Sequence, residues 1–151
     1  MGRRAKKSTW LKPCSVVGWG LVSAAFSGDG RVWSVRYVST RGAAPVLGFD
    51  EVLLTGLARD GGLYVPDTWP HLSAAALKSL AGRPYREIAF AVLRPFIGGT
   101  IADDALEAMI DAAYRDFGHK AVAPLKQIDS NLFLLELFHG PTLAFKDYAL
   151  Q

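Results

Sequence analysis

The C-terminal stretch FHGPTLAFKDYALQ, Phe138–Gln151, decides the predicted fold class of this chain. It has the pattern of the end of an apolar strand, a turn with glycine and proline, and the first turn of a helix that carries a lysine. In open α/β sheets, ligands collect beyond the carboxyl ends of the strands, where the next helix begins. The stretch therefore predicts an α/β domain with a lysine, Lys146, at a strand-to-helix junction, where ligands commonly bind.

The predicted setting of Lys146 favours a reactive amine. The positive end of a helix dipole disfavours an ammonium group, and the neighbouring Leu143, Phe145 and Tyr148 would partly remove it from water. A neutral amine can attack a carbonyl carbon. The same residues also fit a solvated lysine whose apolar neighbours simply belong to a core, and the pattern alone leaves both interpretations open.

The segment before this junction is strand-like. Two runs, AVAPLKQI and NLFLLELF, are separated by the turn sequence DSN at residues 129–131. The second run, Leu132–Phe138, is apolar on both faces except at Glu136, a pattern typical of a central strand covered on both sides. We therefore expect residues 119–151 to begin an α/β domain.

A small, mostly helical domain is predicted for residues 35–118. Alternating or β-branched patterns predict short strands at VRYVST and LYVP. Periodic apolar positions predict four helices, which are FDEVLLTGLA, AAALKSLAG, PYREIAFAVLRPF and TIADDALEAMIDAAYRDFG. We find no internal repeat and no low-complexity segment in this sequence.

Local signals predict where the first three helices begin and end. Gly61 or Gly62 is expected to end the first helix, whose Leu53, Leu54 and Leu57 share one face with Phe49. Ser73 is expected to cap the second helix. Pro95 should end or kink the third helix, because proline lacks the backbone donor that a helix interior needs.

The fourth helix has the clearest pattern. Thr100 and Asp103 fit a variant of the capping box, with aspartate in place of the usual glutamate. The expected apolar stripe consists of Leu106, Met109, Ile110, Ala113 and Phe117.

The charge distribution argues against a nucleic-acid partner. The formal net charge is +3 and the isoelectric point is near 9.1. Residues 1–34 hold six basic side chains against Asp29 alone and carry +5, so the remaining residues sum to −2. Because the body is mildly acidic, we expect no nucleic-acid binding. No apolar run reaches the ~18 residues of a membrane span, so we expect no membrane partner.

Residues 1–34 form an extension with three interpretations. It resembles a secretory signal, an organelle transit peptide, or upstream sequence read from a start codon placed too early. Its single cysteine, Cys14, can form neither an internal disulfide nor a metal cluster, and no metal is expected. We expect a cytoplasmic protein, and an organellar or secreted one only if residues 1–34 are a targeting segment.

Two stretches resemble the threonine synthase family, whose members are pyridoxal-phosphate enzymes. VRYVSTRGAAPVLGFDEVLLTGLARDGGLYVP resembles the N-terminal domain of the family, and LELFHGPTLAFKDYALQ resembles its cofactor-lysine segment. The resemblance covers residues 35–151, and Val35 stands where the family commonly has its first methionine. It implies the opening of a fold-type II α/β domain, truncated here, behind a small helical domain.

The resemblance also implies an activity and a set of roles. The family converts O-phosphohomoserine and water to threonine and phosphate, with Lys146 holding pyridoxal phosphate and then serving as a base. His139 either hydrogen-bonds a phosphate or serves as a capping or packing residue, and Thr142 either contacts the cofactor or caps the helix. Arg41 either meets an anionic substrate or pairs with a carboxylate at the domain interface, and Asp147 is a first-turn acid.

The family pattern continues beyond residue 151, with a phosphate-binding loop and a partner for the pyridine nitrogen. We therefore expect this chain to be a truncated enzyme without activity of its own, and the sequence leaves its oligomeric state open. Three alternatives remain. They are a related phospho-lyase or dehydratase that releases a keto acid, an interaction module built from residues 35–118, and a gene fragment with no independent role.

Overall fold

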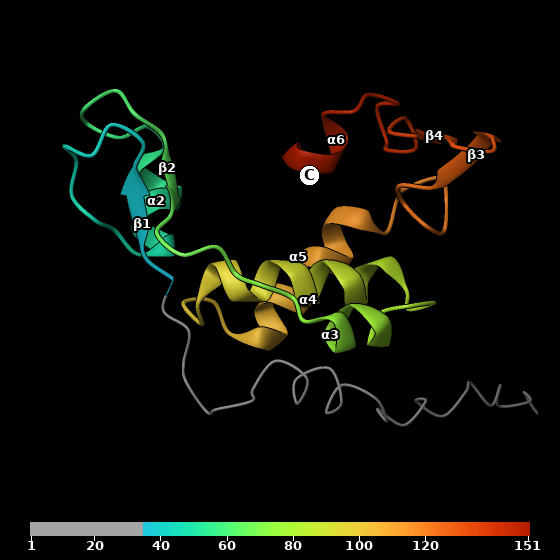
Figure 1. Cartoon of the computed structure of the whole chain (residues 1–151), viewed down its shortest axis with the longest axis horizontal. Coiled ribbons are helices and arrows are strands. Elements are labelled where there is room, and N and C mark those ends of the chain that lie inside the picture. Colours follow the sequence, from blue (N-terminus) through green and yellow to red (C-terminus); the bar gives the residue numbers. More distant parts are fainter. Residues whose placement is uncertain (1–34) are drawn as a thin grey trace, which may run out of the picture.

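The computed structural model describes residues 35–151 (Figure 1). The interpretations of residues 1–34 and the expectation for Cys14 lie outside these described residues. No helix among residues 35–151 is long and apolar enough to cross a membrane. In chain order the elements are β1 Tyr37–Ser39, α2 Phe49–Thr55, β2 Tyr64–Pro66, α3 Ala74–Ser79, α4 Tyr85–Ile97, α5 Asp103–Tyr114, β3 Leu125–Asp129, β4 Leu132–Leu135 and α6 Asp147–Leu150.

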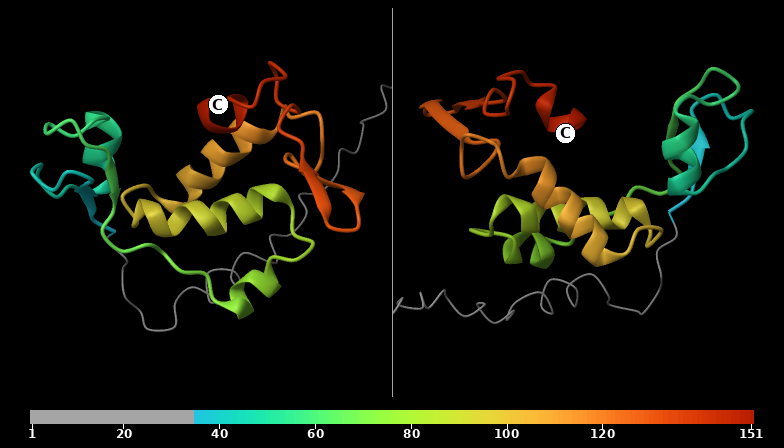
Figure 2. Two further views of the ribbon diagram at one scale, coloured as in Figure 1. Left: turned by 45° about the horizontal axis from the view of Figure 1, so that its top comes forward. Right: turned by 180° about the vertical axis from the view of Figure 1, so that it is seen from behind.

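The helices α3, α4 and α5 form the middle of the described chain. Strands β1 and β2 pair antiparallel and lie with α2 at one end of this helical layer, while β3 and β4 lie toward the other end (Figures 1 and 2). Helix α6 lies beside the C-terminal end of α5, where the Tyr114 hydroxyl donates to the Tyr148 carbonyl. The two sheets are separate, and each has two strands. The mixture of helices and strands agrees with the predicted α/β content.

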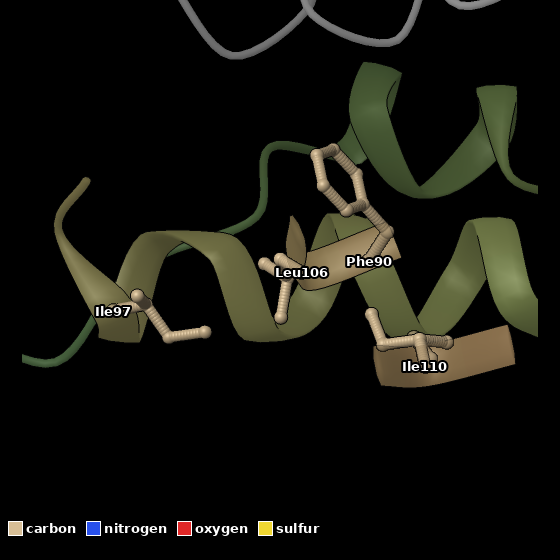
Figure 3. Packing of buried hydrophobic residues seen from close by; sticks show 5 residues of the cluster. Phe90, Ile97, Leu106 and Ile110 are labelled. Carbon is tan, nitrogen blue, oxygen red and sulfur yellow. The ribbon is translucent and has the colours of Figure 1, made fainter. Parts of the chain in front are cut away.

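The core lies between α4 and α5. Leu106 and Ile110, one helical turn apart on α5, are 5% and 4% exposed and pack against Phe90 and Ile97 of α4 (Figure 3). Residues at i and i+4 share a helix face, so this pair gives α5 one apolar side. The predicted stripe is confirmed at these two residues and at Phe117, which is 9% exposed, whereas Met109 is 56% exposed.

A buried tyrosine joins the small sheet of β1 and β2 to the helical layer. The Tyr37 hydroxyl donates a 2.6 Å hydrogen bond to the carbonyl of Phe96, at the end of α4. Its ring lies 6.3 Å from that of Phe49 on α2. Burial raises the pKa of Tyr37, as expected for a phenol removed from water. The predicted strand at the start of the body therefore also anchors the N-terminal end of the fold.

Helix α2 ends earlier than predicted. The chain leaves the helix at Gly56, whose φ of 70° is in the left-handed half of backbone space, and its N–H bonds the Val52 carbonyl. Gly61 does adopt a positive φ of 76°, but in a separate tight turn. Leu53 and Leu54 are 66% and 88% exposed, so no buried apolar face extends the helix to the predicted end.

The ends of the other helices divide into confirmed and wrong predictions. Ser73 caps α3 as predicted, with its hydroxyl accepting the Ala76 N–H at 3.1 Å. Pro95 does not end α4, which continues to Ile97 and stops at Gly98 in the left-handed conformation, and a kink at Pro95 stays a prediction. A proline in the last turn removes only one donor, and the burial of Ile97 holds that turn in place.

The predicted capping box at the start of α5 is absent. The N-cap residue is Ala102, which has no side-chain capping bond. The Thr100 hydroxyl instead donates to the Ile97 carbonyl at 2.9 Å, and the Asp103 carboxylate binds Arg94 at 2.8 Å. Both predicted capping groups are therefore used to join α5 to the end of α4.

The prediction of a covered central strand is wrong for the described residues. Strand β4 pairs only with β3 in an antiparallel hairpin, and every residue of both strands is exposed. The turn at residues 129–131 folds β4 back onto β3, and no helix within residues 35–151 buries either face. The strand between Leu132 and Phe138 is also shorter than predicted, because β4 ends at Leu135.

The core predicts a clear contrast between two neighbouring side chains of α5. Leu106→Ala should lower the free energy of unfolding by about 2–5 kcal/mol, because it removes buried methyl groups and leaves a cavity. Met109→Ala, at a position 56% exposed, should change it by no more than about 1 kcal/mol. Urea unfolding of the two variants checks this, and equal losses would contradict the assignment of the core.

Candidate functional site

Lys146 lies at the junction between the turn and α6, in the N-cap position. Its carbonyl accepts the N–H groups of Ala149 and Leu150 at 3.0 and 3.1 Å, so its backbone belongs to the helix. Within residues 35–151 its ammonium group has no hydrogen bond or ion pair. Leu143 and Phe145 are 74% and 67% exposed, so the predicted removal of the lysine from water is not achieved by its apolar neighbours in the described chain.

The residue after the lysine is the buried one. Asp147 is 4% exposed, and its carboxylate accepts the Thr142 N–H at 2.8 Å and the Thr142 hydroxyl at 2.6 Å. The position of Asp147 in the first turn of α6 is confirmed, but its main partner is the loop and not the helix dipole. Thr142 does not cap the helix, since its hydroxyl serves this bond. The sequence signal for this pair is a hydroxyl residue and an acid on either side of the lysine.

His139 is occupied by local partners. Its Nε2 lies 2.8 Å from a carboxylate oxygen of Glu136, and its ring stands 5.1 Å from the ring of His119. Its carbonyl accepts the Gly118 N–H at 2.7 Å. These contacts join the segment before the lysine to the end of the helical layer, which corresponds to the packing interpretation of His139.

Four aromatic rings connect the lysine segment to the core. The series runs from Tyr85 on α4 through Tyr114 and Phe117 to Tyr148 on α6, with successive centroids 4.9, 5.4 and 4.9 Å apart. The Tyr148 hydroxyl donates to the Val122 carbonyl at 2.7 Å, and the Tyr148 carbonyl accepts the Tyr114 hydroxyl at 3.1 Å. Burial, together with Tyr114, raises the pKa of Tyr85 to about 12. The short helix α6 is thus held by packing and hydrogen bonds against α5.

Arg41 lies in a separate cluster, in the turn after β1. Its Nη1 donates to the Asp60 carbonyl at 3.0 Å, so within residues 35–151 it pairs with a backbone oxygen and not with a carboxylate. The Asp60 carboxylate accepts Ser39 Oγ, Ala43 N–H and Gly62 N–H at 2.8, 3.0 and 2.9 Å. The sheet of β1 and β2 is well separated from α6 in every view (Figures 1 and 2), so within residues 35–151 the turn after β1 does not meet the segment that carries the lysine.

Comparison with solved structures defines the class of protein first. A PLP-bound threonine synthase from Brucella melitensis matches with a TM-score of 0.73 and 59% identity, over 76% of this chain and 25% of that chain. The threonine synthase from yeast matches with a TM-score of 0.70 and 40% identity, over 76% of this chain and 24% of that chain. These structures are enzymes of mixed helix and strand content.

Sequence comparison then gives the family. The family model described as "Threonine synthase N terminus" matches residues 36–114. Threonine synthase from Pseudomonas aeruginosa is 56% identical over 117 residues, which are 78% of this chain and 25% of that protein. The chain belongs to the threonine synthase family. It spans about a quarter of the length of the curated relatives it matches.

The Asp60 cluster generates a prediction about pH. The Gly62 N–H, followed by the Ser39 and Ala43 groups, holds the pKa of Asp60 below its ordinary value of 3.8. A carboxylate with a lowered pKa stabilises the fold above its unfolded pKa, and this stabilisation is lost as the pH falls through the folded pKa. The amide proton shifts of Ala43 and Gly62 should therefore titrate together with a midpoint below 3.8.

The matched control is Asp60→Asn, which removes the titrating group. In this variant the same two amide shifts should stay flat over the acid range. A midpoint above 3.8 in the unmodified chain, or an unchanged titration in the variant, would contradict the role given to the Asp60 carboxylate.

Proposed function

We propose that this chain supplies the lysine-bearing part of a threonine synthase that converts O-phosphohomoserine and water to threonine and phosphate with pyridoxal phosphate. The single observation that carries the proposal is the position of Lys146, whose backbone is fixed at the start of α6 while its amine remains accessible. Support comes from membership of the family and from the PLP-bound relative of 59% identity.

Among the described residues, Lys146 fits the binding of an aldehyde cofactor. An amine must be accessible and without a competing partner to bind an aldehyde carbon, and within the described chain Lys146 meets this condition. Thr142 and His139 are less suited to direct contact, because their donors are directed at Asp147 and Glu136. We assign them the supporting role of shaping the turn before the lysine.

The chemistry divides between the cofactor and this chain. Pyridoxal phosphate supplies an electron sink for the bonds at the substrate Cα. The Lys146 amine would hold the cofactor at the start of α6 and would also serve as the base that accepts and returns a proton at the substrate Cα. Because Arg41 does not reach Lys146 within residues 35–151, we assign it the structural role of fixing the turn after β1 through the Asp60 carbonyl, and not a contact with the substrate.

We further propose that residues 35–118 and 119–151 are two structural units and that the protein works in the cytoplasm. The change from helices before Gly118 to strands after it supports the division into two units. The single cysteine of the sequence suits a reducing compartment and supports the cytoplasmic location.

A chimeric enzyme tests the proposed function. Residues 35–151 replace the matching 117-residue part of the Pseudomonas aeruginosa threonine synthase, which is 56% identical. The chimera should form threonine and phosphate from O-phosphohomoserine. Lys146→Arg in the chimera should lower kcat by at least about a hundredfold, because the base and the attachment point are both lost. Lys126→Arg, in the exposed hairpin, is the matched control and should keep the activity.

Retained turnover in the Lys146→Arg chimera would overturn the assignment. The 151-residue chain by itself should release no detectable phosphate from O-phosphohomoserine, because its lysine is exposed and nothing within residues 35–151 excludes water from it. Turnover by the chain alone would show that this requirement is met in another way.

A further inference from the structure

Asp147 and Ser39 are the buried polar side chains of the described chain, and Asp147 adjoins an exposed lysine. A buried carboxylate is costly unless its oxygens receive hydrogen bonds. Here both oxygens are occupied, because Oδ2 accepts the Thr142 N–H and Oδ1 accepts the Thr142 hydroxyl. Gln151 Nε2 adds a longer contact to Oδ1 at 3.5 Å. The carboxylate therefore closes a loop that begins at Thr142 and ends at the lysine.

The turn before this loop is shaped to receive the carboxylate. A Cβ atom built on Gly140 would overlap the side chain of Asp147, so only glycine leaves room for it. Gly140 is itself buried. The requirement at this position is space and not an unusual backbone angle, and it makes the glycine and the aspartate a matched pair.

The loop contains one strained residue. Leu143 has a φ of 59°, in the left-handed region that disfavours a branched side chain, and its N–H bonds the Gly140 carbonyl at 3.0 Å. Its side chain is 74% exposed, so packing does not hold it there. Such conformations persist only where the surroundings over-determine them. The bonds from Thr142 to Asp147, on either side of Leu143, provide this restraint.

The lysine between these restraints is fixed in backbone but not in side chain. The Asp147 N–H bonds the Ala144 carbonyl at 3.1 Å, and the Lys146 carbonyl receives two helix bonds. Tyr148 then attaches the helix to α5. The Lys146 backbone is thus bounded by the loop on one side and by the core on the other.

We propose that Asp147 is a positioning residue, which sets the direction of the Lys146 side chain by binding Thr142 and closing the loop between them. This inference rests on the proposed function of Lys146. The Asp147 carboxylate does not contact the lysine amine and acts through the backbone.

The charge state of Asp147 agrees with this role. The Thr142 hydroxyl, followed by the Thr142 and Ala144 backbone groups, holds the pKa of Asp147 below its ordinary value of 3.8. The group is therefore an ionised acceptor at neutral pH, which makes its hydrogen bonds stronger than those of a neutral amide.

The first test uses the 151-residue chain without cofactor and measures hydrogen exchange at the Thr142 amide. This amide should be protected, and Asp147→Ala should remove the protection because the acceptor is lost. Asp147→Asn should keep part of it, since an amide oxygen can still accept the N–H. Thr142→Ser should keep it fully. Asp116→Asn is the matched control, an exposed acid near the end of α5 whose loss should not affect the Thr142 amide.

The second test uses the chimeric enzyme. Asp147→Ala should lower kcat by at least about tenfold, because even a small displacement of a reacting group strongly lowers the reaction rate. KM should change by less than about twofold, because substrate contacts are not removed. Asp147→Asn should restore part of kcat. The circular dichroism of bound pyridoxal phosphate should change with Asp147→Ala, since it reports how the cofactor is held.

A double-variant cycle tests the route from Asp147 to the lysine. Thr142→Val should lower kcat in the chimera, but it should add almost nothing to Asp147→Ala, because the hydroxyl acts through a carboxylate that Asp147→Ala has already removed. Additive losses would overturn the proposal. An unprotected Thr142 amide in the unmodified chain, or full protection in Asp147→Ala, would also overturn it. Retained turnover in the Lys146→Arg chimera is a different result on a different variant, and it counts against the proposed function.

Discussion

The packing of α5 on α4 is the constraint on which the described structure depends. Leu106 and Ile110 form the buried face of α5. They pack against Phe90 and Ile97 of α4. A core this small leaves little surplus of hydrophobic stabilisation over conformational entropy. The N-terminal sheet and the lysine segment are therefore both attached to this helix pair and not to each other, Tyr37 on one side and Tyr148 on the other.

The two attachments use the same chemistry. In each, a phenol ring packs against a second aromatic ring, Phe49 for Tyr37 and Phe117 for Tyr148. The hydroxyl of each then donates to a backbone carbonyl, that of Phe96 for Tyr37 and that of Val122 for Tyr148. Tyrosine suits this because it carries a large apolar ring with a polar tip. The path from the core to the lysine is then short, through Tyr114 and Tyr148 to the first turn of α6.

Local signals predicted the elements well and their limits poorly. The serine cap of α3, the acids at the start of α2 and the lysine at the helix start could be predicted because each depends on neighbours in sequence. Three other features depend on contacts between elements and not on neighbours in sequence. The lengths of α2 and α4 depend on which residues are buried. The start of α5 depends on the bond between Arg94 and Asp103. The Asp147–Thr142 pair was within reach of the sequence, but an acid in a first helical turn already had a sufficient explanation.

A reactive lysine needs a fixed side-chain direction and the exclusion of water. The structure around Lys146 shows that these two requirements depend on different parts of the sequence. Direction is encoded locally, since Gly140, Thr142 and Asp147 fix the backbone around the lysine within eight positions of sequence. Exclusion of water is not local, because the apolar residues next to the lysine point to solvent in the described chain. A loop can therefore fix the direction of the lysine side chain even where no other residues shield its amine from water. On the proposed function of Lys146, the exclusion of water that its chemistry needs therefore depends on residues distant in sequence, whereas the direction of its side chain depends on neighbours.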